Sequence, residues 1–374
     1  MPVTDPVDVP VIDADGHVLE PRAAFAHLPD HQRPQIHTDA RGLDHVVVDD
    51  QEIFVGSLGM LGTPGAVVAD LTNAKPLEEA IAGAFDPHAR LADLDVEGLD
   101  AVVLYPTVGL AYWAIADPAT AVAVVRAYND WLASFCAADP TRLFGVAVLP
   151  FQDPAAAAAE LRRAHDELGF RVAMVRPNPC AGRTIVDPAN EVVWETAEAL
   201  DVAIGIHEGS QPAIATLGLD RAPYNALVLH ATSHAFEHMM ACAQLMALGV
   251  MERHPGLRFV FLEAGGGWAP YWLERLDHQV GRFGGYAPEM VHLPSEYFAR
   301  QCWISFEVDE HTLPVLAPVV GTDRIVWGTD YPHPDCTFPG MVKELRGTIA
   351  GLPARDQARI LGRNAVDLYR LPGF

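Results

Sequence analysis

The chain has 374 residues, of which 50% are apolar and 20% are charged, so it can build a large core and does not have the composition of a disordered chain. Its formal net charge of −24 argues against nucleic acid or an anionic membrane surface as a partner. It has no apolar run of about 18 residues and no N-terminal signal-peptide pattern, which predicts a cytoplasmic protein.

After an apolar strand that ends near residue 18, residues 22–44 are irregular and dotted with proline. Alternating apolar residues predict a hairpin over 44–55, and the Gly-, Ala- and Pro-rich stretch 57–85 has the composition of a lid or long loop. We therefore expect residues 44–85 to be an insertion near the mouth of a larger fold.

From residue 99 onwards, buried-type strands alternate with amphipathic helices. Strands are expected at 99–105, 143–149, 171–175, 202–207, 257–263, 302–307 and 325–330, and helices at 115–138, 153–168, 189–200, 233–253, 268–283 and 310–320. With the opening strand this gives eight units, which predicts one (β/α)8 TIM-barrel domain over residues 1–374. Residues 356–371 are expected to form a closing helix.

The opening strand carries the first candidate site. On a strand, Asp13, Asp15 and His17 point to the same face, and Glu20 follows just beyond the turn. Three carboxylates and an imidazole in one place repel one another unless a cation lies among them, which favours a metal. The alternative is a charged surface turn in which Asp15 caps a helix.

Acids and histidines also end later strands, at His207, Glu263, Glu307 and Asp330. Because the carboxyl ends of barrel strands meet at one face, metal binding explains these positions better than a ring of ion pairs. Each position also has a structural alternative. His207 could bind a rim carbonyl, Glu263 could pair with Arg275, Glu307 could begin a helix and Asp330 could cap a turn. His333, close behind Asp330, is a candidate for supporting a ligand rather than being one.

Three histidines, at 230, 234 and 238, are spaced by four and share one helix face. We expect one of them to reach the metal and favour His234, which starts the helix predicted over 233–253. Only two lysines occur, Lys75 and Lys343, and neither ends an apolar strand pattern, which argues against a carboxylated or Schiff-base lysine. The five cysteines are scattered and are expected to be reduced.

Four ordered motifs resemble those of the amidohydrolase-related metal-dependent TIM barrels: IDADGHVLEP, IHEG, GVMERHPGLRFVFLEAGGGWAPYWLERLD and GTDRIVWGTDYPHPD. The resemblance covers nearly the whole chain. It implies that His17, His207 and Asp330 are metal ligands and that Asp15 stands where the family has a histidine or glutamate. It also places Glu263 where the decarboxylases of the superfamily have a catalytic histidine.

That replacement makes the ligand set rich in carboxylates, which suits iron better than zinc. The chain therefore resembles a branch of the superfamily that includes the non-haem di-iron monooxygenase of platensimycin biosynthesis. This resemblance implies a di-iron monooxygenase that hydroxylates an unactivated C–H bond of a bulky apolar, CoA-linked substrate, with electrons from a ferredoxin or reductase. The two irons would be held by Asp15, His17, Glu20, His207, His234, Glu263 and Asp330.

Further expectations accompany this hypothesis. Glu263 and His234 are the expected catalytic residues, Asp13 is expected to support the ligands from one layer deeper, and superfamily barrels commonly pair, which favours a homodimer. The walls of an apolar pocket are expected from Trp113, Trp268 and Trp272, for which ordinary packing is an equal alternative.

Two alternatives remain open. The first is a mononuclear zinc or manganese hydrolase or decarboxylase, with Glu263 as general base. The second is a barrel that has lost catalysis and serves as a binding protein.

Overall fold

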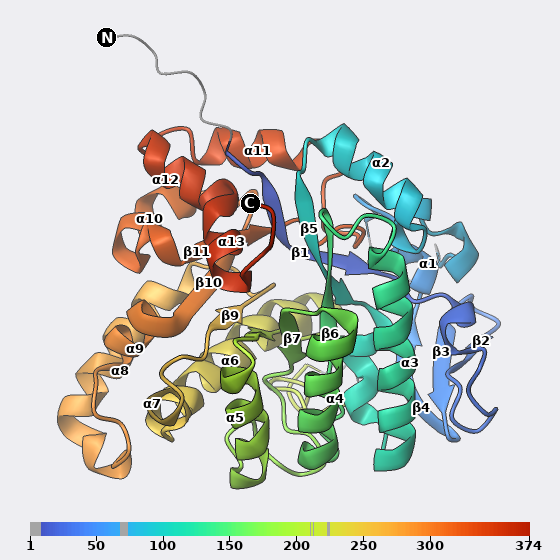
Figure 1. Cartoon of the computed structure of the whole chain (residues 1–374), viewed down its shortest axis with the longest axis horizontal. Coiled ribbons are helices and arrows are strands. Elements are labelled where there is room, and N and C mark those ends of the chain that lie inside the picture. The colour runs from blue at the N-terminus through green and yellow to red at the C-terminus, as the bar shows by residue number, and fades with distance from the viewer. Residues whose placement is uncertain (1–8, 68–73, 210, 212, 223–224) are drawn as a thin grey trace.

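A computed structural model describes residues 9–67, 74–209, 211, 213–222 and 225–374. Eight parallel strands follow one another around a barrel in chain order (Figure 1). They are β1 (Ile12–Val18), β5 (Ala101–Pro106), β6 (Leu143–Val148), β7 (Val172–Val175), β8 (Ala203–Ile206), β9 (Phe259–Phe261), β10 (Cys302–Glu307) and β11 (Ile325–Gly328). The predicted (β/α)8 fold is confirmed.

The barrel closes where β1 meets the segment that follows β11. The Asp330 amide donates to the Asp15 carbonyl over 3.0 Å, and the His17 amide donates to the Tyr331 carbonyl over 2.7 Å. The last strand thereby brings its carboxyl end directly beside the acidic motif of the first strand. Backbone hydrogen bonds alone therefore hold the segment around Asp15 and His17 beside the segment around Asp330.

The strands are short apolar runs with buried residues on both faces, as expected for strands surrounded by helices. The covering helices are α2 (Pro87–Glu97), α3 (Pro118–Cys136), α4 (Pro154–Leu168), α5 (Glu191–Ala199), α6 (Ala226–Ala247), α7 (Val250–Arg253), α8 (Trp268–Phe283), α9 (Pro294–Gln301), α10 (Leu313–Val320) and α11 (Met341–Thr348). Several begin with an Asp-Pro pair, in which the aspartate accepts amide protons of the first turn, as Asp153 does at α4.

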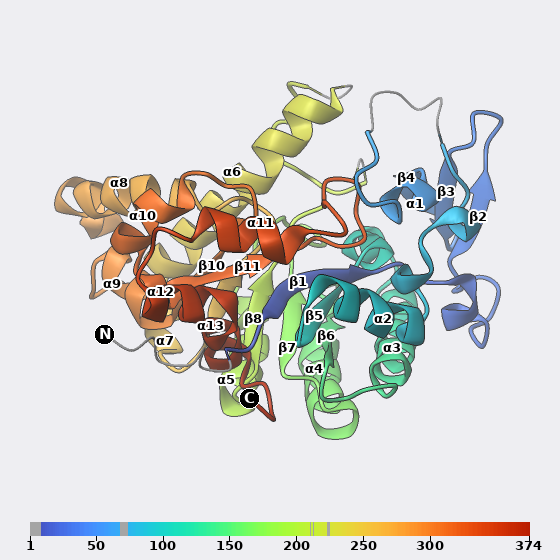
Figure 2. The same cartoon turned by 90° about the horizontal axis from the view of Figure 1, so that it is seen from above.

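Helix α6 begins seven residues earlier than predicted. Asn225 accepts the Val228 amide and caps the helix at Ala226, so the apolar stripe used for the prediction marks only its second half. The first half projects beyond the barrel rim (Figure 2). Consequently His230 and His234 lie within the helix and not at its start.

The insertion after β1 contains a three-stranded antiparallel sheet. The predicted hairpin is present as β3 (Asp44–Val48) and β4 (Gln51–Gly56), but β2 (Gln35–Thr38) adds a third strand from a stretch expected to be irregular. Its sequence, QIHT, has too little apolar alternation to predict a strand, and pairing with β3 stabilises it. A short helix, α1 (Leu58–Leu61), follows, and the Gly65 amide donates to the Cys336 carbonyl beside the barrel mouth. Residues 68–73 of the predicted lid lie outside the described ranges.

The C-terminal segment closes the opposite end, as α12 (Ala354–Ala358), a π-helical turn (Arg359–Arg363) and α13 (Asn364–Tyr369). The Tyr369 hydroxyl donates to the Ala14 carbonyl over 3.0 Å, which ties α13 to β1. All five cysteines are unpaired and buried. None of the helices in the described ranges combines the length and the apolar character needed to cross a bilayer.

Candidate metal centre

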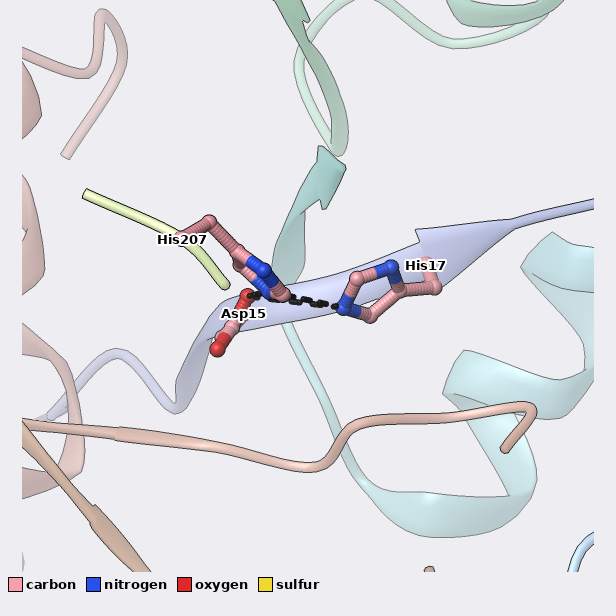
Figure 3. Close-up of side chains that lie close together, drawn as sticks. All are labelled: Asp15, His17 and His207. Atoms are coloured by element: carbon pink, nitrogen blue, oxygen red, sulfur yellow. Dashed lines mark hydrogen bonds and ion pairs between the residues drawn. The ribbon is translucent and has the colours of Figure 1, made fainter. Parts of the chain in front are cut away.

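The first three members of the site come from β1 and β8. Asp15, His17 and His207 are buried, and their side chains converge at the carboxyl end of the barrel (Figure 3). The Nε2 atoms of the two histidines are 3.2 Å apart, and Asp15 Oδ1 lies 3.4 Å from His207 Nε2 and 3.7 Å from His17 Nε2. A β-bulge between Asp13 and Gly16 offsets the pairing of β1 with β5 at this point.

The other nitrogen of each imidazole determines what the Nε2 atoms present. His17 Nδ1 lies 2.8 Å from the Pro106 carbonyl and His207 Nδ1 lies 2.6 Å from the Glu208 carbonyl, so each Nδ1 carries the proton and donates it. In the neutral form of the two rings both Nε2 atoms are therefore unprotonated, with lone pairs facing each other at 3.2 Å. A cation between them removes this repulsion, and neutral imidazole is the form that ligates metals.

Two further carboxylates reach the same point. Asp330 Oδ1 lies 3.3 Å from His17 Nε2, and Glu263 Oε2 lies 3.3 Å from His207 Nε2. Both residues have positive φ, 53° for Asp330 and 49° for Glu263, a backbone conformation that costs free energy for residues other than glycine. The backbone is therefore strained at Glu263 and Asp330, where two strands end and the carboxylates turn towards the histidines.

The electrostatics of this cluster call for a positive ion. Burial raises the pKa of Glu263 and of Asp330 well above the usual range, and neighbouring carboxylates raise both further. Burial lowers the pKa of His17 well below its usual value, with His333 and His207 acting in the same direction. Within the described residues, the buried atoms Asp15 Oδ1 and Asp330 Oδ2 accept no hydrogen bond. Oxygens without donors beside unprotonated nitrogens fit a divalent metal ion.

Metal affinity is expected to increase with pH. Because the pKa of Asp330 is raised in the metal-free protein, metal binding to its carboxylate must displace a proton. For this proton, the apparent affinity should rise about tenfold per pH unit below the raised pKa. Manganese titrations at pH 6, 7 and 8 measure the slope, and an affinity independent of pH would show that this carboxyl group is already ionised.

Of the three histidines on α6, His234 faces the cluster. His234 Nε2 lies 3.6 Å from Glu263 Oε1, and His230 Nε2 lies 4.0 Å from the same oxygen, with a side chain that is 56% exposed. His238 faces away, since its two nitrogens lie against the carbonyls of His234 and Ile206. His234 is therefore the member of this face nearest the cluster, with His230 at the rim, and its contact with a metal stays a prediction.

Glu20 is not brought to the cluster. Its two carboxylate oxygens accept the Val108 and Gly109 amides at 2.8 Å, at the start of the 3₁₀ helix Val108–Ala114, although burial still raises its pKa to about 7. The prediction of Glu20 as a ligand overlooked these amides, which come from another strand–helix connection. With both oxygens engaged, Glu20 anchors the rim of the barrel.

Asp13 lies one layer deeper than Asp15 and Asp330. Its carboxylate accepts the amides of Asp15 and Thr329 and the Thr329 hydroxyl. One side chain thus connects β1 to the residue that precedes Asp330, which fixes two candidate ligands relative to each other. His333 supports Asp330 from the other side, with Nδ1 2.6 Å from Asp330 Oδ1 and Nε2 2.9 Å from the Thr107 hydroxyl.

A cavity of about 290 Å³ opens beside the cluster. Two of its acids received little weight from the sequence. Glu307 ends β10, and Asp335 belongs to a group with Glu263 and Asp330 that could hold a cation. In the sequence, Asp335 ends the Tyr-Pro-His-Pro-Asp stretch, which has the composition of a turn, so its acidic side chain does not stand out as a candidate ligand.

The three tryptophans expected to form an apolar pocket do not line this cavity. Trp113 is buried and donates to the Leu149 carbonyl, Trp268 packs edge-on against Phe261, and Trp272 donates to the Met239 carbonyl. The packing alternative is therefore correct for these residues. The described lining of the cavity at the cluster instead carries several carboxylates and none of these tryptophans, whose predicted wall was the main support for a bulky apolar substrate.

Comparison with known proteins adds to this geometry. The chain is 27% identical over 308 residues to 2-amino-3-carboxymuconate-6-semialdehyde decarboxylase of Dictyostelium discoideum, covering 80% of this chain and 81% of the relative. It is 30% identical over 305 residues to gamma-resorcylate decarboxylase of a Rhizobium species, covering 76% and 87%. Both relatives are named as decarboxylases.

Solved structures agree in fold. 5-carboxyvanillate decarboxylase of Sphingomonas paucimobilis has a TM-score of 0.71 and 26% identity, over 97% of this chain and all of that one. Dihydroxybenzoic acid decarboxylase of a Polaromonas species, solved with manganese and 2-nitroresorcinol, has a TM-score of 0.70 and 23% identity, over 97% of each chain. The amidohydrolase family model matches residues 12–371. The chain therefore belongs to the amidohydrolase family and is a metal-dependent enzyme of that superfamily.

Proposed function

We propose that this protein is a divalent-metal-dependent, non-oxidative decarboxylase that acts on a small aromatic carboxylate. The observation that carries the proposal is the convergence of two unprotonated Nε2 atoms with two carboxylate oxygens that lack donors in the described structure. In this proposal a single zinc or manganese ion is held by Asp15, His17, His207 and Asp330. The relatives are decarboxylases and favour this alternative over the oxygenase hypothesis.

The cavity beside the cluster supports an acid as substrate only when a metal is present. The described residues that line it include Glu263, Glu307, Asp309, Asp330 and Asp335, and no lysine or arginine. An anion would be repelled from this lining. A bound divalent ion would supply the positive charge that holds and polarises the substrate carboxylate.

Decarboxylation needs a proton at the carbon that loses carbon dioxide, because the electron pair of the broken C–C bond stays on that carbon. We propose that Glu263 delivers this proton. Burial raises its pKa well above the usual range, which keeps a proton on its carboxyl group in the metal-free protein. His234 Nε2 lies 3.6 Å from Glu263 Oε1 and the exposed His230 stands next to it, so these two imidazoles form a path for reprotonation from solvent.

A dinuclear iron oxygenase is the second candidate, and the position of Glu263 favours it. Its Oε2 faces His207, whereas its Oε1 faces His234 and His230, so this carboxylate stands between two groups of potential ligands. Glu263 would then belong to the residues that hold two irons, whose chemistry would be dioxygen activation with electrons from a ferredoxin or reductase. The CoA-linked substrate expected for this candidate is not supported by the cavity, whose described lining has no lysine or arginine for the CoA phosphates.

Metal analysis and two activity assays separate the candidates. We expect about one zinc or manganese per chain, and release of carbon dioxide from 2,6-dihydroxybenzoate or a related hydroxybenzoate under nitrogen. The control is the same assay after removal of the metal by a chelator and again after manganese is restored. About two irons per chain, with dioxygen uptake after reduction and no anaerobic carbon dioxide, would reject the decarboxylase and establish the second candidate.

A further inference from the structure

Behind His234 lies a fully buried ion pair that the proposed chemistry does not use. Glu208 follows His207 at the end of β8, and Arg176 follows β7; neither side chain is exposed to solvent. Arg176 Nη2 donates to Glu208 Oε1 over 3.2 Å, and the Asn178 side-chain amide reaches the same oxygen at 3.4 Å. Burying a charge pair at this depth carries a desolvation penalty, so a role in the neighbouring site is a reason for its presence.

The second oxygen of Glu208 faces His234. Glu208 Oε2 lies 3.4 Å from His234 Nδ1, and the Ser233 hydroxyl donates to the same oxygen over 3.3 Å. His234 Nδ1 also lies 3.0 Å from the His230 carbonyl, one turn earlier in α6. The Glu208 carboxylate and the His230 carbonyl accept hydrogen bonds. The Ser233 hydroxyl also lies 3.3 Å from His234 Nδ1, but its proton is donated to Glu208 Oε2, so the proton of a neutral His234 belongs on Nδ1.

We propose that Glu208 is a positioning residue that fixes His234 as its Nδ1–H tautomer and so presents an unprotonated Nε2 to Glu263 and the cavity. Arg176 donates to Oε1 of Glu208 and so holds the side chain with Oε2 turned towards His234. Burial lowers the pKa of His234 well below its usual value, in agreement with a neutral ring. The inference rests on the proposed function only for what His234 Nε2 does, which is to accept a proton or to bind a metal. The tautomer itself does not depend on the reaction.

The surroundings of Glu208 make the Glu208→Gln substitution informative. Arg176 and Asn178 both present donors to Oε1, so the amide oxygen of a glutamine is held at that position. Its NH₂ group then replaces Oε2 and points a donor at His234 Nδ1. A donor facing Nδ1 favours the opposite tautomer, in which Nε2 carries the proton and its lone pair is lost from the cavity.

The matched control is Glu237→Gln. Glu237 lies three residues after His234 in α6, is equally buried, and accepts the Leu217 amide over 2.7 Å. Its replacement changes a buried carboxylate in the same helix and the same electrostatic neighbourhood. The structure gives Glu237 no contact with His234 among the described hydrogen bonds and ion pairs, so the tautomer of His234 should not change in this variant.

The experiment is nitrogen-15 NMR of histidine-labelled, metal-free protein, with the His234 signal assigned by its loss in His234→Asn. We expect the Nδ1–H tautomer in the wild type and in Glu237→Gln, and a measurable shift towards Nε2–H in Glu208→Gln. Manganese titration of the same proteins is expected to show a loss of about 10- to 100-fold in affinity for Glu208→Gln only, if Nε2 is a ligand.

The wild-type spectrum is decisive if Glu208→Gln fails to fold, because an Nε2–H tautomer in the native protein would overturn the inference. An unchanged Nδ1–H signal in a folded Glu208→Gln variant would also overturn it. A shifted tautomer without carbon dioxide release from any hydroxybenzoate would support the role of Glu208 and reject the decarboxylase instead.

Discussion

Replacing His207 by alanine is expected to remove the bound metal and to abolish the activity that depends on it. His207 Nε2 is within 3.4 Å of His17 Nε2, Asp15 Oδ1 and Glu263 Oε2, so it lies at the centre of the cluster. Loss of a supporting residue alone typically weakens metal binding about 10- to 100-fold, and loss of this nitrogen should exceed the upper figure. Metal content after dialysis and manganese titration measure the effect.

The control for this substitution is His238→Asn. His238 is also a buried histidine close to His234, but its nitrogens face the His234 and Ile206 carbonyls and not the cluster. We expect this variant to lose stability through the broken hydrogen bonds, while the folded protein keeps its metal. Full metal occupancy in His207→Ala, or equal loss of metal in both variants, would show that the binding position lies elsewhere.

The sequence predicted the barrel and the gathering of Asp15, His17, His207, Glu263 and Asp330 correctly, for one physical reason. Parallel strands of a barrel deliver their carboxyl ends to the same face, so a polar residue that ends an apolar run is placed there by topology. The two-residue period of a strand then predicted that Asp13, Asp15 and His17 share one face of β1, with Asp13 one layer deeper as a supporting residue. That these side chains bind a metal stays a prediction.

Features that depend on the path of a loop could not be predicted in this way. Glu20 has the right chemistry and stands three residues after His17, but the chain has left the strand and its oxygens meet two amides of a distant segment. Strand β2 and the first half of α6 carry weak apolar patterns and form through pairing and capping. The tryptophans were equally ambiguous, because large aromatic residues serve packing and binding alike.

The choice between decarboxylase and oxygenase depended on one residue and could not be made from sequence physics. Glu263 in place of a histidine changes the charge of the site by one unit, which is compatible with more iron or with a different proton donor. The structure sharpens this choice because Glu263 stands between two groups of histidines. The contribution of Glu263 to stability, measured as a function of pH, is therefore the most informative property.

Glu263→Gln is expected to stabilise the metal-free protein at pH 8. The folded-state pKa of Glu263 is raised, so the wild type loses stability as the pH rises from the unfolded-state pKa, near 4.5, through that higher value. A neutral amide removes this loss. A gain of about 1 kcal/mol corresponds to a melting temperature about 2–4 °C higher. The gain should vanish at pH 4, where the wild-type carboxyl group is protonated in both states.

Glu97→Gln is the control for Glu263→Gln, because it replaces a buried glutamate that the fold itself uses. Glu97 is also a buried glutamate, but its two oxygens accept the Gly340 and Val342 amides at 2.7 and 2.6 Å. A glutamine there turns an NH₂ group towards one of these donors, so the variant should melt below the wild type and bind metal normally. Removing a carboxylate that the fold needs lowers the stability, whereas removing one kept for the chemistry of the site raises it. If Glu263→Gln also lowered the melting temperature of the metal-free protein at pH 8, Glu263 would belong with Glu97 as part of the scaffold, and the proton donor would have to be sought at His234.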